Sequence, residues 1–430
     1  MYVFLTISDN TYPNVAAALT GQSAQELSDT CLKHKPGVSH FDDCPHAWKN
    51  FSDRGYITVF GEDAPWMGAF NYLKKGFKSQ PTDYYFRTLA SPLESKLGTA
   101  TFGSAATCYG PRLAFKLLLD YMKRISTVID SKQRLFEFIW SSSLFHDSAR
   151  LPMIGDAALQ QFLIWMKSSG KLEHTALILM SDHGMRFGAL RSTYQGKIED
   201  RLPFVHFVFP EWFRAKYPMA IANMEANKRK LTTPFDLHAT LLDLAELENI
   251  SDETIRERMA TASEWSGSDI PRGISLFVPI PSFRDCTMAG IPYQWCMCLQ
   301  KREIQNDSLE AMEAGAALVQ LINDKVSEFA QCAFVTLKKL VLVERVVLPE
   351  KYYRKKRMEV FDVKIVASPA DASFESTILK SRQGKWSFSG SLSRTNKYGN
   401  QSYCVEDSEA KKYCFCYDQY LVNKTGVEES

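Results

Sequence analysis

The residues with the clearest chemical potential stand at the end of a short apolar run, in the order Ser181-Asp182-His183-Gly184. The run over residues 175–180 predicts a strand, and ligands bind at the carboxyl ends of strands in open α/β sheets. Adjacent Asp182 and His183 can give a divalent metal one hard oxygen and one imidazole nitrogen. The alternative is a plain turn, in which Asp182 caps the backbone and His183 is exposed.

A second reactive group is the hydroxyl of Thr11, which stands before Pro13 at an expected chain bend. The short helix expected after it ends near Gly21. A hydroxyl at a helix N-terminus is well placed to attack an anionic ester, because the free N–H groups and the helix dipole hold the ester oxygens. Threonine is a weak nucleophile unless a metal or a base lowers its pKa. The alternative is a structural N-cap.

Apolar runs and amphipathic stretches supply the elements that would position these residues. The apolar runs are bounded like buried strands and cover residues 56–60, 175–180 and 203–209. Helical patterns cover residues 115–129, 157–169 and 235–247. Strands that alternate with helices favour an α/β sandwich with a mostly parallel sheet.

The character of the chain changes toward its C-terminal end. A short helix is expected at residues 308–322, and strand-like runs follow at 340–348 and 358–366. The alternation in the last run predicts a half-exposed antiparallel sheet. The sequence therefore predicts an α/β domain over residues 1–271 and a smaller Cys-rich α+β subdomain over residues 272–430.

Ten cysteines, seven of them after Pro271, indicate the redox environment. The close pairs Cys296/Cys298 and Cys414/Cys416 have one residue between them, whereas zinc sites usually have two to four, so disulfides are favoured over zinc knuckles. Five N-glycosylation sequons occur as well, at Asn50, Asn249, Asn306, Asn400 and Asn423. Together these features favour an extracellular protein or one of the secretory-pathway lumen.

Charge and hydropathy argue against two classes of partner. The formal net charge is +2, so neither nucleic acid nor an anionic membrane surface is favoured. No run of about 18 apolar residues occurs, so no transmembrane segment is predicted in this chain.

Taken together, the two reactive stretches resemble the alkaline phosphatase/sulfatase superfamily, through Thr11-Tyr12-Pro13-Asn14 and the much later Ser181-Asp182-His183-Gly184. Within it, the chain is most similar to an animal family catalogued as domain of unknown function 229. Matching blocks lie along nearly the whole chain, at residues 56–63, 80–83, 143–147, 181–188, 195–204, 232–243 and 272–277. The resemblance implies a three-layer α/β/α sandwich of alkaline-phosphatase/sulfatase type with the smaller Cys-rich α+β subdomain after it.

The resemblance also implies roles for individual residues. Thr11 would be the catalytic nucleophile, and Asp182, His183 and Thr11 itself would ligate a divalent metal, zinc or manganese. His146 would be a further catalytic residue that serves a second metal or the substrate. Asn14 and Lys197 would bind substrate, with Lys197 near an anionic leaving group.

Other polar residues in the matching blocks are expected to be structural. Glu199 and Arg201 are expected to pair with each other. Asp236 lies in a block that forms a packing helix in the relatives, and so does His238, which remains a candidate ligand.

Two departures from the relatives bear on the metal. Two-metal relatives have an aspartate four residues before His146, where this chain has Ser142. One metal rather than two is therefore expected, and Asp147 would either substitute as a ligand or orient His146. Relatives also have a strand ending in an acidic metal ligand well before the nucleophile. Ten residues precede Thr11 here, so the sequence is expected to be truncated at its N-terminus.

The function implied is a metal-dependent hydrolase or transferase that acts on phosphate or sulfate esters through a threonyl intermediate. The substrate would be a small molecule or a glycan or lipid ester. Threonine favours phosphoryl transfer, because sulfatases use a residue made from cysteine or serine and neither stands at position 11. The alternative is a catalytically inactive secreted relative that acts as a binding or structural protein.

Overall fold

The structure is a computed structural model that describes residues 3–33, 39–129, 132–191, 193–266, 269–348, 358–407 and 409–419. The chain divides into two compact units. The first unit contains residues 1–6, 10–185 and 202–284, and the second unit contains residues 7–9, 186–201 and 285–430.

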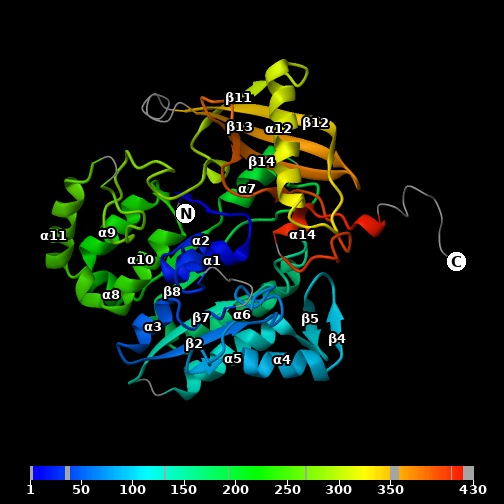
Figure 1. Cartoon of the computed structure of the whole chain (residues 1–430). Helices are drawn as coiled ribbons and strands as arrows, with labels where there is room; N and C mark the ends of the chain where they lie inside the picture. The colour runs from blue at the N-terminus through cyan, green and yellow to red at the C-terminus, as the bar shows by residue number, and fades with distance from the viewer. Residues whose placement is uncertain are drawn as a thin grey trace. The chain divides into compact units, whose positions relative to one another are not determined.

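The first unit is built on a parallel sheet in which β2 (Tyr56–Glu62) lies between β3 (Tyr84–Tyr85) and β7 (Arg134–Trp140). Alternate side chains of these strands point to opposite faces, so each face needs its own cover. Figure 1 shows helices on both faces of this sheet.

Two separate apolar clusters show which helices cover which face. On one face, Val15 and Leu19 of α1 (Thr11–Thr20) and Trp48 of α3 (Ala47–Ser52) pack with Phe60 of β2. On the other face, Leu118 of α5 (Ala114–Val128) packs with Phe86 and Ile139. The expected three-layer α/β/α sandwich is therefore confirmed.

Local signals explain where several helices begin and end. Helix α10 (Pro234–Ala245) begins with a capping box between Thr233 and Asp236. Helix α6 (Pro152–Ser168) has proline in its first turn, and Gly170 follows it with a φ of 72°. Helix α6 thus begins five residues earlier than the sequence pattern predicts, because a proline is favourable at the first helical position.

The remaining elements of the first unit are short. They are β1 (Val3–Phe4), α2 (Ala24–Asp29), α4 (Arg87–Lys96), β4 (Thr99–Thr101), β5 (Ala106–Tyr109), β6 (Arg112–Leu113), η1 (Lys171–Glu173), β8 (Leu177–Met180), β9 (Val205–Val208), α8 (Glu211–Lys216), α9 (Pro218–Asn227), β10 (Leu231–Thr232), η2 (Leu247–Ile250) and α11 (Asp252–Ser263).

The strands β8 and β9 differ from expectation in direction and in burial. They pair with each other antiparallel, whereas β1 pairs with β10 in parallel. All four residues of β8 are only half-buried. A parallel pair needs a crossover that packs on the sheet, and the helix between β8 and β9, α7 (Tyr194–Arg201), belongs to the second unit.

The second unit contains an antiparallel sheet in the order β11-β12-β13-β14-β15, with β16 beside β14. Its elements are β11 (Gln300–Ile304), β12 (Thr336–Val347), β13 (Glu359–Ser368), β14 (Ala372–Lys380), β15 (Trp386–Phe388), β16 (Ser393–Arg394), α7, η3 (Tyr293–Trp295), α12 (Leu309–Val326) and α14 (Ala410–Tyr413). Helix α12 covers one face, where Ala314 and Leu318 pack with Phe361 and Val363.

The opposite face of this sheet is more buried than the sequence predicts. Asp362 and Glu375 are each only 4% exposed. Ion pairs link these carboxylates to Lys197 and Arg201 of α7 and to Arg191, which lies just before α7. Charged residues that the sequence pattern places toward solvent are therefore covered.

Four disulfides confirm the expected use of most of the cysteines. One lies in the first unit, Cys31–Cys44, and three lie in the second, Cys286–Cys296, Cys332–Cys414 and Cys404–Cys416. Cys108 and Cys298 are free thiols. Within the described part of the chain, no helix has the length and apolar character needed to cross a membrane.

The sequon asparagines are compatible with modification. Asn50, Asn249, Asn306 and Asn400 are half-buried or exposed, and Asn423 lies outside the described residues.

Candidate metal and nucleophile site

Thr11 is the first residue of α1, so its hydroxyl lies beside the N–H groups of the first helical turn. The preceding Asn10 has extended backbone and its side chain does not cap the helix. Asn14 is buried, and its amide donates a hydrogen bond to the carbonyl of Asn10 at 3.0 Å. The side chain of Asn14 thus stabilises the turn that presents Thr11.

His183 follows β8 and has a defined tautomer. Its Nδ1 lies 2.7 Å from the carbonyl oxygen of Gly184, which can only accept, so Nδ1 carries the proton. With the proton on Nδ1, the neutral form of the ring has its lone pair on the other nitrogen, Nε2. Ser181 fixes the turn further, because its hydroxyl donates to the carbonyl of His183 at 2.7 Å. A neutral histidine held by a backbone carbonyl is the form that binds metals.

Two oxygen atoms lie close to Nε2 of His183 and could bind the same metal ion. Nε2 of His183 lies 3.5 Å from Oγ1 of Thr11 and 3.3 Å from Oδ2 of Asp182. Asp182 is 7% exposed, and its Oδ2 accepts no hydrogen bond from the described residues. A buried carboxylate oxygen without a donor is costly, and a lone pair facing it adds repulsion. A cation between them would remove both penalties.

The spacing of these atoms fits a metal ion. Ligands of a tetrahedral ion at about 2.1 Å are about 3.4 Å apart, which agrees with the 3.3 and 3.5 Å measured from His183 Nε2. A carboxylate, an imidazole and a hydroxyl form a donor set that suits zinc or manganese. Asp182, His183 and Thr11 are thus brought together, although 172 positions separate Thr11 from His183.

His146 lies in a different turn, after β7, and Asp147 orients it. Nδ1 of His146 is 3.2 Å from Oδ1 of Asp147. The same carboxylate accepts hydrogen bonds from the backbone N–H and the hydroxyl of Ser104, at 2.6 and 2.8 Å. Burial acts to raise the pKa of Asp147, but the bonds from His146 and Ser104 hold it well below its usual value. Of the two expected roles of Asp147, the structure therefore supports the orienting one.

Asp63 supports the same turn, and sequence reasoning gave it no role. This buried carboxylate follows β2 and accepts hydrogen bonds from the backbone N–H groups of Ser142 and Ser143, at 2.8 and 3.1 Å. It also accepts from the hydroxyls of Ser141 and Ser143. The signal available in the sequence was an acidic residue directly after a buried strand.

Lys197 lies in the second unit, on α7, where acidic residues hold its side chain. Its Nζ is 2.7 Å from Oε1 of Glu375 and 3.8 Å from Asp362. Arg201 pairs with Glu375 as well, at 3.0 Å, rather than with Glu199. Residues two positions apart point to different sides of a helix, which is why the expected Glu199–Arg201 pair does not form.

Asp236 and His238 of α10 have structural surroundings. Asp236 is fully buried in a bidentate ion pair with Arg284, at 2.9 Å for both contacts, and accepts the N–H of Ile274. His238 packs against Gly21 at the end of α1, and burial lowers its pKa to about 4.

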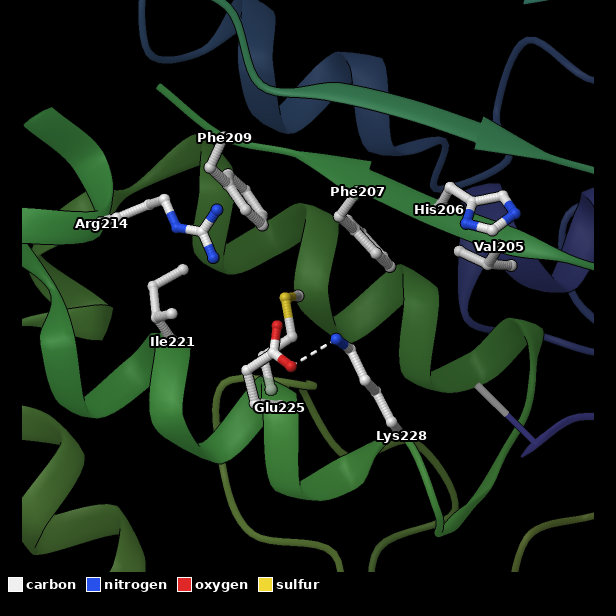
Figure 2. A pocket seen from close by; sticks show the side chains of 9 residues that line it. Val205, His206, Phe207, Phe209, Arg214, Ile221, Glu225 and Lys228 are labelled. Carbon is white, nitrogen blue, oxygen red and sulfur yellow. Dashed lines mark hydrogen bonds and ion pairs between the residues drawn. The ribbon is translucent and has the colours of Figure 1, made fainter. Parts of the chain in front are cut away.

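A small cavity of about 130 Å³ also occurs in the first unit, between β9 and helices α8 and α9. Figure 2 shows the rings of Phe207 and Phe209 on one side and the Glu225–Lys228 ion pair on the other. None of the expected site residues lines it.

The sequence profile of one protein family matches residues 1–341, under the description "Protein of unknown function (DUF229)". The chain belongs to this family. The whole first unit of this DUF229 member lies within the match, and with it Thr11, His146, Asp182 and His183. A search of the curated proteins finds no match to it.

Two solved structures resemble the DUF229 chain weakly. The lipoteichoic acid synthase LtaP from Listeria monocytogenes aligns over 56% of this chain and 62% of its own, with 11% identity and a TM-score of 0.37. The chain thus spans less than two thirds of that protein. A protein from Bacteroides thetaiotaomicron, described with the metabolism of multiple glycosaminoglycans, aligns over 88% of this chain and 79% of its own, with 12% identity and a TM-score of 0.38. Likenesses at this level identify no activity.

Proposed function

We propose that the chain is a metal-dependent hydrolase or transferase of phosphate or sulfate esters, in which Thr11 forms a threonyl intermediate. The observation that carries the proposal is the convergence of Thr11, Asp182 and His183, with a buried carboxylate oxygen that has no donor. Asp182, His183 and Thr11 would hold one zinc or manganese ion. When bound, such an ion supplies Lewis-acid stabilisation and a lower pKa for a coordinated hydroxyl.

The residues of this chain would position the ester and its nucleophile. Thr11 stands at the N-terminus of α1, so N–H groups of the first turn can hold the non-bridging oxygens of the ester while Oγ1 attacks. The hydroxyl of Thr11 would release its proton to solvent, and the bond from Oγ1 to phosphorus or sulfur would form as the bond to the leaving oxygen breaks. Water or an acceptor alcohol then releases the threonyl ester. His183 keeps its proton on Nδ1 throughout, bonded to Gly184.

His146, Asn14 and Lys197 have supporting roles in this proposal. His146, oriented by Asp147, would donate a proton to the leaving oxygen. Asn14 and Lys197 would contact the substrate. For Lys197 this contact requires release from Glu375.

The substrate class and the location are proposed more broadly. The ester would be carried by a small molecule, a glycan or a lipid. Four disulfides support an extracellular or secretory-lumen location, because such bonds persist in oxidising compartments. The second candidate is an inactive relative with a binding role. The ion pair that holds Lys197 favours that candidate.

The deciding experiment measures metal content in the purified protein. We expect about one equivalent of zinc or manganese in the wild type and a large loss in Asp182→Asn and His183→Ala. Asp156→Asn changes an exposed carboxylate on α6 and should leave the metal content unchanged. Thr11→Ala should keep most of the metal and lose ester turnover. A folded wild type that binds no metal would overturn the enzyme proposal in favour of the binding protein.

A further inference from the structure

The second unit contains a cavity of about 540 Å³ over the face of its sheet that α12 does not cover. Three parts of the second unit line the cavity. They are residues 191, 193, 194 and 197 around the start of α7, the strands β11 to β14, and residues 297 and 299 just before β11. A volume of this size suits a ligand as large as a substituted monosaccharide.

Basic residues surround the floor of this cavity, and its buried carboxylates are already fully paired. The carboxylate of Glu375 forms ion pairs with Lys197 at 2.7 Å, Arg201 at 3.0 Å and Arg191 at 3.3 Å. Although burial alone would raise it, these cations hold the pKa of Glu375 well below its usual value. Asp362 accepts ion pairs from Lys301 and, at 3.8 Å, from Lys197.

One cation in the lining lies beside a carboxylate that other cations already hold. Lys364 of β13 is half-buried and forms no ion pair with any described carboxylate, although it is the cross-strand neighbour of Glu375. Burial lowers the pKa of Lys364, while the charge of Glu375 acts to raise it and those of Arg191 and Lys197 act to lower it. Burial likewise lowers the pKa of Lys301, against the opposing effect of Asp362. Both shifts show that these ammonium groups are partly removed from water.

The count of charged side chains around the cavity gives a small positive surplus. Five cations line the cavity or pair with residues that line it, namely Arg191, Lys197, Arg201, Lys301 and Lys364. Three buried carboxylates do the same, namely Asp200, Asp362 and Glu375. Glu344, half-buried and also in the lining, reduces the surplus to one positive charge. An unneutralised cation away from bulk water is costly, so an anion in this cavity would be stabilised.

We propose that this cavity is a binding site for a sulfate or phosphate group carried on a larger polar molecule, with Lys364 as its principal contact. Lysine ammonium groups bind tetrahedral oxyanions well, because they act as point charges with freely rotating donors. Tyr194, 77% exposed in the lining, offers a ring face for the rest of that molecule. All residues of this site belong to the second unit, and of the residues proposed to act in the chemistry at Thr11 it shares only Lys197, so anion binding here is testable without that chemistry.

Calorimetric titration with inorganic sulfate and inorganic phosphate tests the proposal. The titrations use the Asp182→Asn protein with a chelator present, so that anion binding at Thr11 does not contribute. We expect saturable binding that weakens about tenfold or more in Lys364→Gln, the loss typical of a charged hydrogen bond. The matched control is Lys339→Gln, which removes an exposed lysine from β12 and should leave binding unchanged.

A second variant tests the direction of the charge effect. Glu344→Gln removes the carboxylate that opposes the anion, so it should tighten sulfate binding several-fold. A merely structural role of the cavity would not produce tighter binding. No saturable binding in the parent protein, or equal weakening by Lys364→Gln and Lys339→Gln, overturns the site. If Lys364→Gln does not fold, unchanged or weaker binding by Glu344→Gln overturns it. The affinities for sulfate and phosphate are then compared, and the protein is titrated with a sulfated and a phosphorylated sugar. The tighter ligand in each comparison shows whether the site binds a sulfate or a phosphate ester.

Discussion

Glu62 is a carboxylate inside the first unit, at the last position of β2. Its side chain is buried, and Oε1 accepts a hydrogen bond from the backbone N–H of Ala69 at 2.6 Å. Burial, with a smaller contribution from Asp63, raises the pKa of Glu62 to about 7. The folded chain therefore keeps a proton at pH values where the unfolded chain has released it. The stability contributed by this group is present at low pH and is lost as the pH rises through about 7.

Glu62→Gln should remove this pH dependence, because glutamine keeps the acceptor but does not ionise. We compare the free energy of unfolding of the variant with that of the wild type at two pH values. The difference in favour of the variant should be about 3 kcal/mol larger at about pH 8 than at about pH 5. Urea unfolding at both pH values measures the difference. The control Glu257→Gln changes an exposed position of α11 and should show no pH-dependent gain in the free energy of unfolding. A gain from Glu62→Gln that did not vary with pH would contradict the burial argument.

The Arg284–Asp236 pair is the most buried ion pair described in the first unit, with both side chains 0% exposed. Arg284→Met would leave the Asp236 carboxylate charged and without its bidentate partner. We expect a loss of about 3–5 kcal/mol in the free energy of unfolding. Arg54→Met breaks a half-exposed pair with Glu246 and should cost about 1 kcal/mol or less. Chemical denaturation of both variants measures this, and equal losses would refute a special role for burial.

The candidate site shows what sequence can predict about single residues. Thr11, Asp182 and His183 could be named from the resemblance, and they lie together as a shared site requires. The orienting contacts could not be named. Asp63 bonds to residues nearly eighty positions away, and Asp147 bonds to Ser104, forty-three positions away. Such contacts depend on how distant turns meet, which no local pattern encodes.

At the scale of elements, periodicity predicts best where one face alone is buried. Helices α5, α10 and α12 lie within a few residues of their predicted bounds, and so does β2. Predictions of burial and direction were weaker. The strand β8 is apolar but half-exposed, because antiparallel pairing with β9 is set by the path of the intervening chain. The burial of Asp362 on β13 depends on Lys197 of α7, more than 150 positions earlier in the sequence.

The segment before β11 holds three cysteines whose sulfur atoms lie within 4.8 Å of one another. Cys286 and Cys296 form a disulfide, and the exposed Cys298 is free. We expect iodoacetamide to modify Cys298 in the native protein. Cyanogen bromide cleaves after Met288 and Met297, so it separates the three cysteines and shows which two are joined.

Cys296→Ser tests how close Cys298 is in solution. Because its sulfur is within reach of Cys286, we expect a Cys286–Cys298 disulfide to form in the variant, with no free thiol left in this segment. The fragments from cyanogen bromide cleavage would show the new pairing. Two free thiols in the folded variant would contradict the arrangement of the three sulfurs.

The two units of the whole molecule differ in how their cores are stabilised. The sheet of the first unit has helices on both faces and encloses aromatic side chains between layers. The sheet of the second unit has one apolar face under α12 and one face of buried ion pairs. Because buried ion pairs contribute little net stability, the second unit depends more on covalent links, and three of the four disulfides lie there.

The disulfide that should matter most to the second unit is Cys332–Cys414, because it joins residues 82 positions apart. Cys404–Cys416 joins residues 12 positions apart. From chain entropy, we expect replacement of the first pair by serines to cost about 4.5 kcal/mol and replacement of the second to cost about 3 kcal/mol. Hydrogen exchange of the slowest amides in α12 and β13 measures the loss. Exchange in β2 and α5 of the first unit should not change, and replacing Cys31 and Cys44 should produce the reverse pattern. Equal losses for the two C-terminal pairs would show that loop length does not control the stability of this unit.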